Sequence, residues 1–220
     1  MLAVLILPLV LAITVHEAAH GWTAYRLGDP TAFQLGRVSF NPLKHIDPVG
    51  TILVPLTLFL ISNVAGGGFI FGWAKPVPVN ARQLHHPRRD MALVALAGPG
   101  VNLIMALLWG LVVHLGWLSS AQMPQVAEVL IVMGAAGILI NLLLMVLNLF
   151  PLLPLDGGRI FHALLPVPVA RQFARLEPFG LIILLALLFT GVLGALLWPT
   201  VMTLAALIPG GAAVGQAFLG

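Results

Sequence analysis

The sequence predicts an all-α polytopic membrane protein with about five to six transmembrane segments and a short β-hairpin or re-entrant element. Of its 220 residues, 60% are hydrophobic and only 8% are charged. An ordinary soluble domain carries about 25% charged residues, so this chain cannot cover a surface that faces water. Its apolar residues also form long runs separated by glycine and proline, as expected for several membrane helices.

The first apolar run predicts a retained transmembrane helix over residues 1–27, which Gly28, Asp29 and Pro30 bring to an end. The run lacks the basic start of a signal peptide. Residues 31–40 then alternate loosely between apolar and polar types, which favours a short strand or hairpin over a helix.

The next apolar segment, over residues 49–64, is short for a membrane span. Three glycines at 66–68 and a glycine-broken apolar stretch at 69–73 follow it. This pattern favours a re-entrant hairpin, which is stable at membrane depth only where protein covers its backbone. Residues 75–80 hold two prolines and are expected to be extended.

Two longer apolar runs predict helices over residues 90–118 and 126–150, and a short helix is expected over 156–165. A last apolar region begins at residue 179. It is predicted to form two segments, divided by Gly191, Gly194 and Pro199.

We expect residues 1–220 to form a single domain, with its core in 1–165 and C-terminal helices in 170–220. The lysines and arginines fit on one side of the membrane if the N-terminus lies outside. The positive-inside rule then predicts a multi-pass protein of the cell (inner) membrane.

Charge and cysteine content restrict the partners and the chemistry. The formal net charge of +3 is too small to suggest nucleic acid as a partner. The chain has no cysteine, which excludes disulfides, thiolate metal sites and a cysteine nucleophile. Any metal must therefore be held by histidines and carboxylates.

The first helix carries the motif H-E-x-x-H, from His16 through Glu17 to His20. Residues four apart lie on one face of a helix, so both imidazoles can bind one metal ion, and Glu17 is placed to act as a base. The motif lies inside an apolar helix, where polar groups are costly and usually functional.

A catalytic zinc usually takes three protein ligands, so one more histidine or carboxylate is needed. Asp156 is the strongest candidate, because prolines unwind the chain before it and Gly157 and Gly158 permit a tight turn after it. Its position before a short helix suits a helix N-cap equally well. The residues by themselves leave these two roles open.

Together these motifs resemble the site-2 protease family of intramembrane zinc metalloproteases, in a compact bacterial-type branch without PDZ or CBS domains. The resemblance rests on H-E-A-A-H at 16–20, N-x-x-P-x-x-P-L-D-G-G-R at 148–159 and A-G-P-G-V-N at 97–102. A fourth element is F-G-W-A-K-P-V-P-V-N at 71–80. The match spans residues 10 to 165.

The resemblance implies that His16, His20 and Asp156 bind one zinc ion and that Glu17 is the catalytic base. It also implies that Asn148 lies near the metal, where it binds substrate or stabilises the oxyanion. Asn102 is a second candidate for that role. Helix packing or support of the site are alternative roles for Asn102.

We therefore expect a zinc-dependent endopeptidase that cuts within transmembrane or signal-peptide-like helices, with its site in the cytoplasmic half of the bilayer. The segments at 33–40 and 68–79 are candidates for a strand edge that holds the substrate extended. The alternatives are a membrane metal-binding or transport protein and a catalytically silent homologue. The sequence leaves the oligomeric state open.

Overall fold

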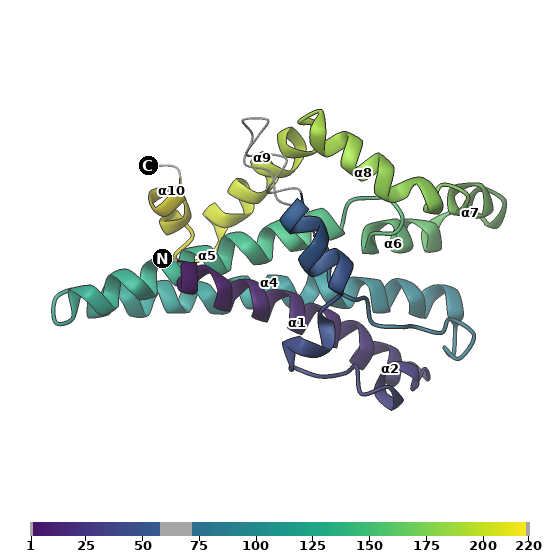
Figure 1. Cartoon of the computed structure of the whole chain (residues 1–220), viewed down its shortest axis with the longest axis horizontal. Helices are drawn as coiled ribbons and strands as arrows, with labels where there is room; N and C mark the ends of the chain where they lie inside the picture. The colour runs from purple at the N-terminus through teal and green to yellow at the C-terminus, as the bar shows by residue number, and fades with distance from the viewer. Residues whose placement is uncertain (1, 58–71, 219–220) are drawn as a thin grey trace.

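Three long helices form the body of the molecule: α1 (Leu2–Arg26), α4 (Pro87–Ser119) and α5 (Pro124–Asn148). The computed structural model describes residues 2–57 and 72–218, and these two ranges contain helices and no strand. The three helices run along the long axis of the molecule and pack on one another (Figure 1). Their bounds confirm the long helices predicted from the apolar runs.

Small residues let α4 and α5 approach closely. A Cβ added at Gly134 on α5 would lie 2.6 Å from the Cγ2 atom of Val113 on α4, and one at Gly137 would overlap the Trp109 ring. Close backbone approach of this kind is a common source of van der Waals attraction between membrane helices. The largest buried apolar cluster surrounds this contact and contains residues Ala106, Trp109, Val113, Ala135, Ile138, Leu142, Met145, Val201, Ala205, Ile208, Ala213 and Val214.

The strand or hairpin expected over residues 31–40 is wrong. The segment begins with a short helix, α2 (Thr31–Gln34), and the described residues after it contain no strand. Asp29 starts this turn, because its Oδ1 atom accepts hydrogen bonds from both the backbone N–H and the hydroxyl of Thr31. Phe33 stacks on Tyr25 of α1 with ring centroids 4.7 Å apart. These local contacts outweigh the alternating pattern.

Two short helical turns follow, η1 (Pro42–His45) and η2 (Pro48–Leu53, a π-helix). The proposed re-entrant hairpin depends mainly on residues 58–71, which lie outside the described residues. Residues 72–80 are extended, as expected, and are attached to the earlier turns. The backbone N–H of Trp73 donates to the carbonyl of Gly50 at 3.0 Å, and that of Lys75 donates to the carbonyl of His45 at 2.9 Å.

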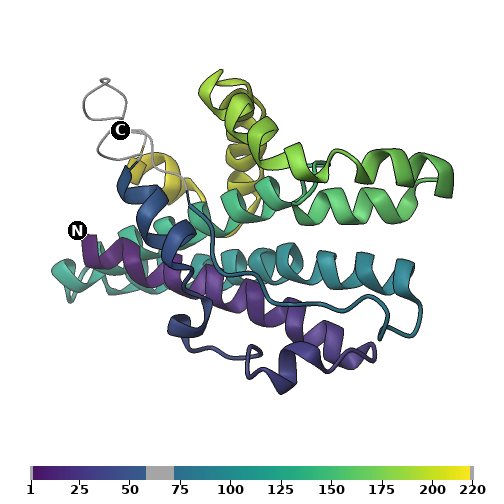
Figure 2. The ribbon, with the colours of Figure 1, turned by 45° about the vertical axis from the view of Figure 1, so that its right-hand side comes forward.

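The chain after α5 forms a series of shorter helices that lie to one side of the long ones (Figure 2). The predicted short helix is present as α6 (Asp156–Leu164). The others are α7 (Val167–Ala174), η3 (Glu177–Phe179), α8 (Gly180–Phe189), α9 (Val192–Leu207) and α10 (Ala212–Phe218).

The predicted division of the C-terminal region into two segments is wrong. One break does occur at Gly191, whose φ of 75° ends α8, but Pro199 lies inside α9. A second break falls before α10, where Gly210 has a φ of 84°. Proline is tolerated within membrane helices, whereas a left-handed residue ends a helix wherever it occurs.

Four helical stretches are long and apolar enough to cross a membrane, which supports the membrane assignment. They are Val4–Arg26, Pro87–Ser119, Pro124–Asn148 and Val167–Phe189. Two further apolar helices in the described part of the chain, Pro48–Thr57 and Val192–Leu207, are shorter. The expected five to six spans are therefore not confirmed.

Candidate metal centre

Two buried histidines and one aspartate meet at the centre of the molecule. His16 and His20 lie one turn apart on α1, and their Nε2 atoms are 3.0 Å apart. Asp156 is the first residue of α6, and its Oδ2 atom lies 3.3 Å from each of these nitrogens. One donor atom from each residue therefore forms a compact triangle. Among the described residues, this is the one group of three or more ionisable side chains with the spacing to hold a metal ion.

The other nitrogen of each imidazole makes a hydrogen bond that sets the ring's orientation. His16 Nδ1 lies 2.6 Å from the Oδ1 atom of Asn102, and His20 Nδ1 lies 2.7 Å from the carbonyl oxygen of Val94. Oxygens of these types accept hydrogen bonds, so both Nδ1 atoms donate. In a neutral imidazole the Nε2 atom then carries a lone pair, which is the form that binds a metal.

This geometry fits zinc. Tetrahedral zinc with bonds of about 2.0–2.2 Å to nitrogen and oxygen places neighbouring ligand atoms roughly 3.3 Å apart. The three observed separations, 3.0, 3.3 and 3.3 Å, match that edge. Asp156 Oδ2 is also buried without a hydrogen-bond partner, and a bound cation would satisfy it. When both imidazoles are neutral with hydrogen on Nδ1, the three facing atoms all carry lone pairs, and such a group favours a cation.

A glycine on α4 leaves room for the two imidazoles. A Cβ added at Gly98 would lie 2.5 Å from His20 Nε2 and 2.6 Å from His16 Cε1. Any larger side chain there would push both rings away from the metal position. By contrast, a Cβ at Gly100 meets nothing within 4 Å. The space at Gly98 is therefore specific to the site.

Asp156 is held by a tightly folded segment rather than by a helix cap. The N-cap position of α6 is Leu155, which makes no side-chain cap hydrogen bond, and Asp156 is the first residue inside the helix. A Cβ at Gly157 or Gly158 would overlap the backbone around Leu149 and Leu152, which explains the glycine pair. Burial raises the pKa of Asp156, but hydrogen bonds and positive charge from His16 and then His20, in the protonated form that their rings take without a metal, outweigh it and bring the pKa to about 2. The carboxylate is therefore ionised at neutral pH, as a metal ligand must be.

Glu17 is oriented by the extended segment. Its Oε2 atom accepts a hydrogen bond of 2.8 Å from the backbone N–H of Val77. The residue is half-buried and follows His16 directly on α1. Residues 72–80 thus connect the candidate base to the turns at η1 and η2.

The sequence relatives agree with this geometry. A protein of Bacillus subtilis named "Putative zinc metalloprotease YwhC" is 39% identical over 196 residues, covering 89% of this chain and 84% of that protein. The chain belongs to the site-2 protease family of zinc metalloproteases.

Two more distant relatives are longer proteins. "Putative zinc metalloprotease Rip2" of Mycolicibacterium smegmatis is 28% identical over 182 residues, covering 82% of this chain and 64% of that protein. Rip2 of Mycobacterium tuberculosis is also 28% identical, and the match covers 80% of this chain and 62% of that protein. This chain thus spans less than two thirds of either Rip2 protein. No family model and no solved structure matches the chain.

The two asparagines that the site-2 protease resemblance singled out lie in different surroundings. Asn102 is fully buried on α4 and contacts His16, while its Nδ2 atom donates to Asn141 at 2.8 Å. Its amide is therefore engaged in supporting a ligand. Asn148 is half-buried at the end of α5 and donates to the carbonyl of Leu144 at 2.9 Å.

Two residues of this site were not predicted. Gly98 lies within the family element at 97–102, but its role depends on how α4 packs on α1. Asn141 gave a weaker signal, as an amide side chain in the middle of a long apolar run. A polar residue at such a position in a membrane helix is usually functional.

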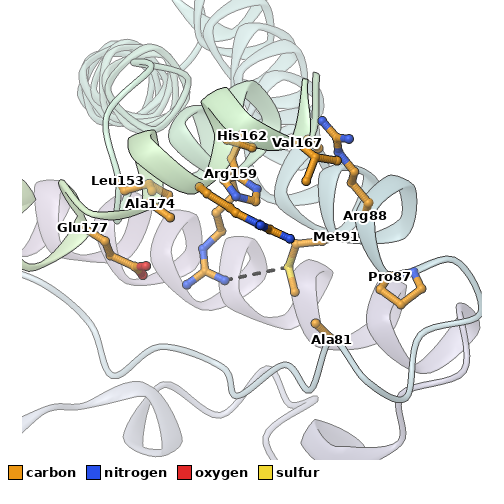
Figure 3. A pocket seen from close by; sticks show the side chains of 13 residues that line it. Ala81, Pro87, Arg88, Met91, Leu153, Arg159, His162, Val167, Ala174 and Glu177 are labelled. Carbon is orange, nitrogen blue, oxygen red and sulfur yellow. Dashed lines mark hydrogen bonds between the residues drawn. The ribbon is translucent and has the colours of Figure 1, made fainter. Parts of the chain in front are cut away.

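A cavity of about 450 Å³ lies near the end of the molecule where α6 and α7 face the start of α4 (Figure 3). It lies between α4 and the α6–α7 pair, and its lining includes Met91, one helical turn before Val94 on α4, and Arg159, three residues after Asp156 on α6. Its lining includes Arg88, Arg159 and Arg171. Within the described part of the chain, none of these arginines forms an ion pair, and Arg159 reaches the sulfur of Met91 at 3.8 Å.

Proposed function

We propose that this protein is an intramembrane zinc metalloprotease that hydrolyses peptide bonds within transmembrane segments of membrane protein substrates, in regulated intramembrane proteolysis. The observation that carries the proposal is the buried triangle of His16, His20 and Asp156, two of whose members lie on a helix apolar enough to cross a membrane. Three protein ligands leave one position for water or substrate, as catalytic zinc sites require.

The depth of the site supports the substrate class. His16 precedes Arg26, the last residue of α1, by ten residues, or about 15 Å of helix. A soluble peptide would have to bury polar groups in the membrane to reach that depth, whereas a transmembrane or signal-peptide-like helix already lies there. Such a helix must unwind locally to expose a peptide bond.

The residues have separable roles in this proposal. His16, His20 and Asp156 would hold the zinc ion, which would supply Lewis-acid activation for hydrolysis. Glu17 accepts the proton of the attacking water and returns it to the leaving amine. The hydrogen bond from the Val77 N–H holds the Glu17 carboxylate in place for this transfer. Asn148 is the candidate to bind substrate or the oxyanion, since Asn102 Nδ2 contacts two acceptors, in Ala12 and Asn141, whereas Asn148 Nδ2 donates to Leu144 and keeps a second N–H for a ligand.

We further propose a multi-pass protein of the cell membrane with its N-terminus outside and its site in the cytoplasmic half of the bilayer. The basic residues support this orientation. The end of α1 and the arginine-lined cavity are both on the side of the molecule that the positive-inside rule assigns to the cytoplasm.

The test is co-expression of the full chain with candidate single-span membrane proteins, comparing wild type with the Glu17→Gln and Glu128→Gln variants. Glu128 is exposed on α5 and provides the matched control. We expect cleavage by wild type and Glu128→Gln, and loss of cleavage by Glu17→Gln with zinc content unchanged. Continued cleavage by Glu17→Gln would refute the assignment. Zinc flux into liposomes carrying the Glu17→Gln variant would favour the transporter alternative.

A further inference from the structure

Two buried asparagines extend from the metal site across three helices. His16 on α1 contacts Asn102 on α4 at 2.6 Å, and Asn102 contacts Asn141 on α5 at 2.8 Å. Asn141 in turn donates from Nδ2 to the backbone carbonyl of Gly137 at 2.8 Å. Both asparagines are 0% exposed. A network of polar side chains inside apolar helices is costly to bury unless each of its donors and acceptors is hydrogen-bonded.

The backbone carbonyl of Gly137 fixes which atom donates and which accepts in each hydrogen bond of this asparagine network. Gly137 O can only accept, so the amide NH₂ of Asn141 faces it and the Asn141 Oδ1 faces Asn102. Asn102 must then present its own NH₂ to Asn141 and its Oδ1 to His16. Asn102 Nδ2 also lies 3.4 Å from the carbonyl of Ala12, which favours the same orientation. Because the Asn102 Oδ1 atom can only accept, the Nδ1 atom of His16 must carry the hydrogen and donate to it.

We propose that Asn141 is a positioning residue for the metal ligand His16. Acting through Asn102, it selects the imidazole form with hydrogen on Nδ1 and directs the Nε2 lone pair to the metal. This inference rests on the metal site of the proposed function and adds a residue that has no contact with the metal position. Partners one shell outside a metal typically change metal affinity about 10–100-fold.

The second histidine shows why the asparagines are needed. His20 Nδ1 donates directly to a backbone carbonyl, that of Val94, and needs no side chain to set its form. His16 lies one turn earlier and meets the side chain of Asn102 instead. An amide can rotate and present either atom, whereas a carbonyl cannot. The bond to Asn141, at 2.8 Å against 3.4 Å to Ala12, is therefore the shorter of the two contacts that fix the Asn102 amide.

Threonine and valine at position 141 provide a matched test. The two side chains have nearly the same shape, but the threonine hydroxyl can donate to the carbonyl four residues earlier and accept from Asn102. Thr200 and Thr203 of α9 already make such bonds to Leu196 and Pro199. We expect Asn141→Val to weaken zinc binding about tenfold or more, and Asn141→Thr to keep it within about threefold of wild type.

The measurement is zinc affinity of the full chain in detergent micelles, by competition with a chelator of known affinity. Thermal melting of the metal-free variants serves as the structural control. Equal losses of affinity in the two variants, or wild-type affinity in Asn141→Val, would overturn the proposal. If wild type itself binds no zinc, the metal site of the proposed function fails, which is a different result.

A second background keeps the test decisive if Asn141→Val melts early. In Asn102→Ala, no amide joins Asn141 to His16, so Asn141 has no contact through which it can orient the imidazole. Adding Asn141→Val to that variant should change zinc affinity by less than about twofold. A tenfold further loss would show that Asn141 acts on the site by packing rather than through Asn102.

Discussion

The helices around the metal site and the C-terminal helices are similarly apolar, but they use polar side chains in opposite ways. In α1, α4 and α5, the buried polar residues nearest the metal site bond across helices, as His16, Asn102 and Asn141 do. In the C-terminal region, Thr190 just after α8 and Thr203 in α9 are exposed and bond to carbonyls one turn earlier, in α8 and in α9 respectively. Apolar character therefore places a helix in the membrane, while polar bonds between helices mark the functional region.

The largest effect is expected from removing the third ligand. Asp156→Ala takes away the one carboxylate of the triangle and leaves the two imidazoles without an anionic partner. Zinc affinity should fall by more than the roughly 100-fold that outer-shell changes cost. Zinc content after dialysis against a weak chelator measures it. Stoichiometric zinc in this variant would mean that Asp156 serves the fold instead.

The next effect separates two glycines on one helix. In Gly98→Ala the new methyl group would lie 2.5 Å from His20 Nε2, so both imidazoles must move. We expect zinc affinity to fall about tenfold or more. Gly100→Ala meets nothing within 4 Å and should bind zinc like wild type. Equal affinities in the two variants would show that the rings tolerate displacement.

A core substitution in the C-terminal region should affect stability without affecting the metal. Leu193 of α9 is 2% exposed and packs with Leu152 and Leu184. Leu193→Ala leaves a cavity and should cost about 2–4 kcal/mol of folding free energy. Its melting temperature in micelles should fall, while zinc affinity at a temperature below the transition stays unchanged. A parallel loss of zinc would show that the two regions are coupled.

The smallest effect is expected at Thr203. Thr203→Val removes a hydroxyl that bonds only to Pro199 within its own helix. The folding free energy should change by no more than about 0.5 kcal/mol, because the side chain is exposed and its shape is kept. Thermal melting and zinc affinity measured side by side would check this. A large change at either would weaken the contrast between the two regions.

Local patterns in the sequence predicted the long helices and the histidine pair of the candidate metal site. The spacing of His16 and His20 was sufficient, because helix geometry brings residues four apart onto one face. The error at 31–40 has a local cause as well. Asp29 starts a helical turn there, and Phe33 finds Tyr25 on the preceding helix, so an alternating pattern did not produce a strand.

The sequence by itself determined that this chain enters a membrane and carries a histidine pair with a glutamate beside it, since composition and helical spacing act within short stretches. The residue pattern left two roles open for Asp156, and only the tertiary structure placed its Oδ2 atom 3.3 Å from both imidazoles, as the family resemblance implies for a ligand. The tertiary structure also revealed Gly98 and Asn141, whose importance lies in what faces them from another helix. Contacts between distant segments depend on how the helices pack, and a pattern read along one helix does not contain that information.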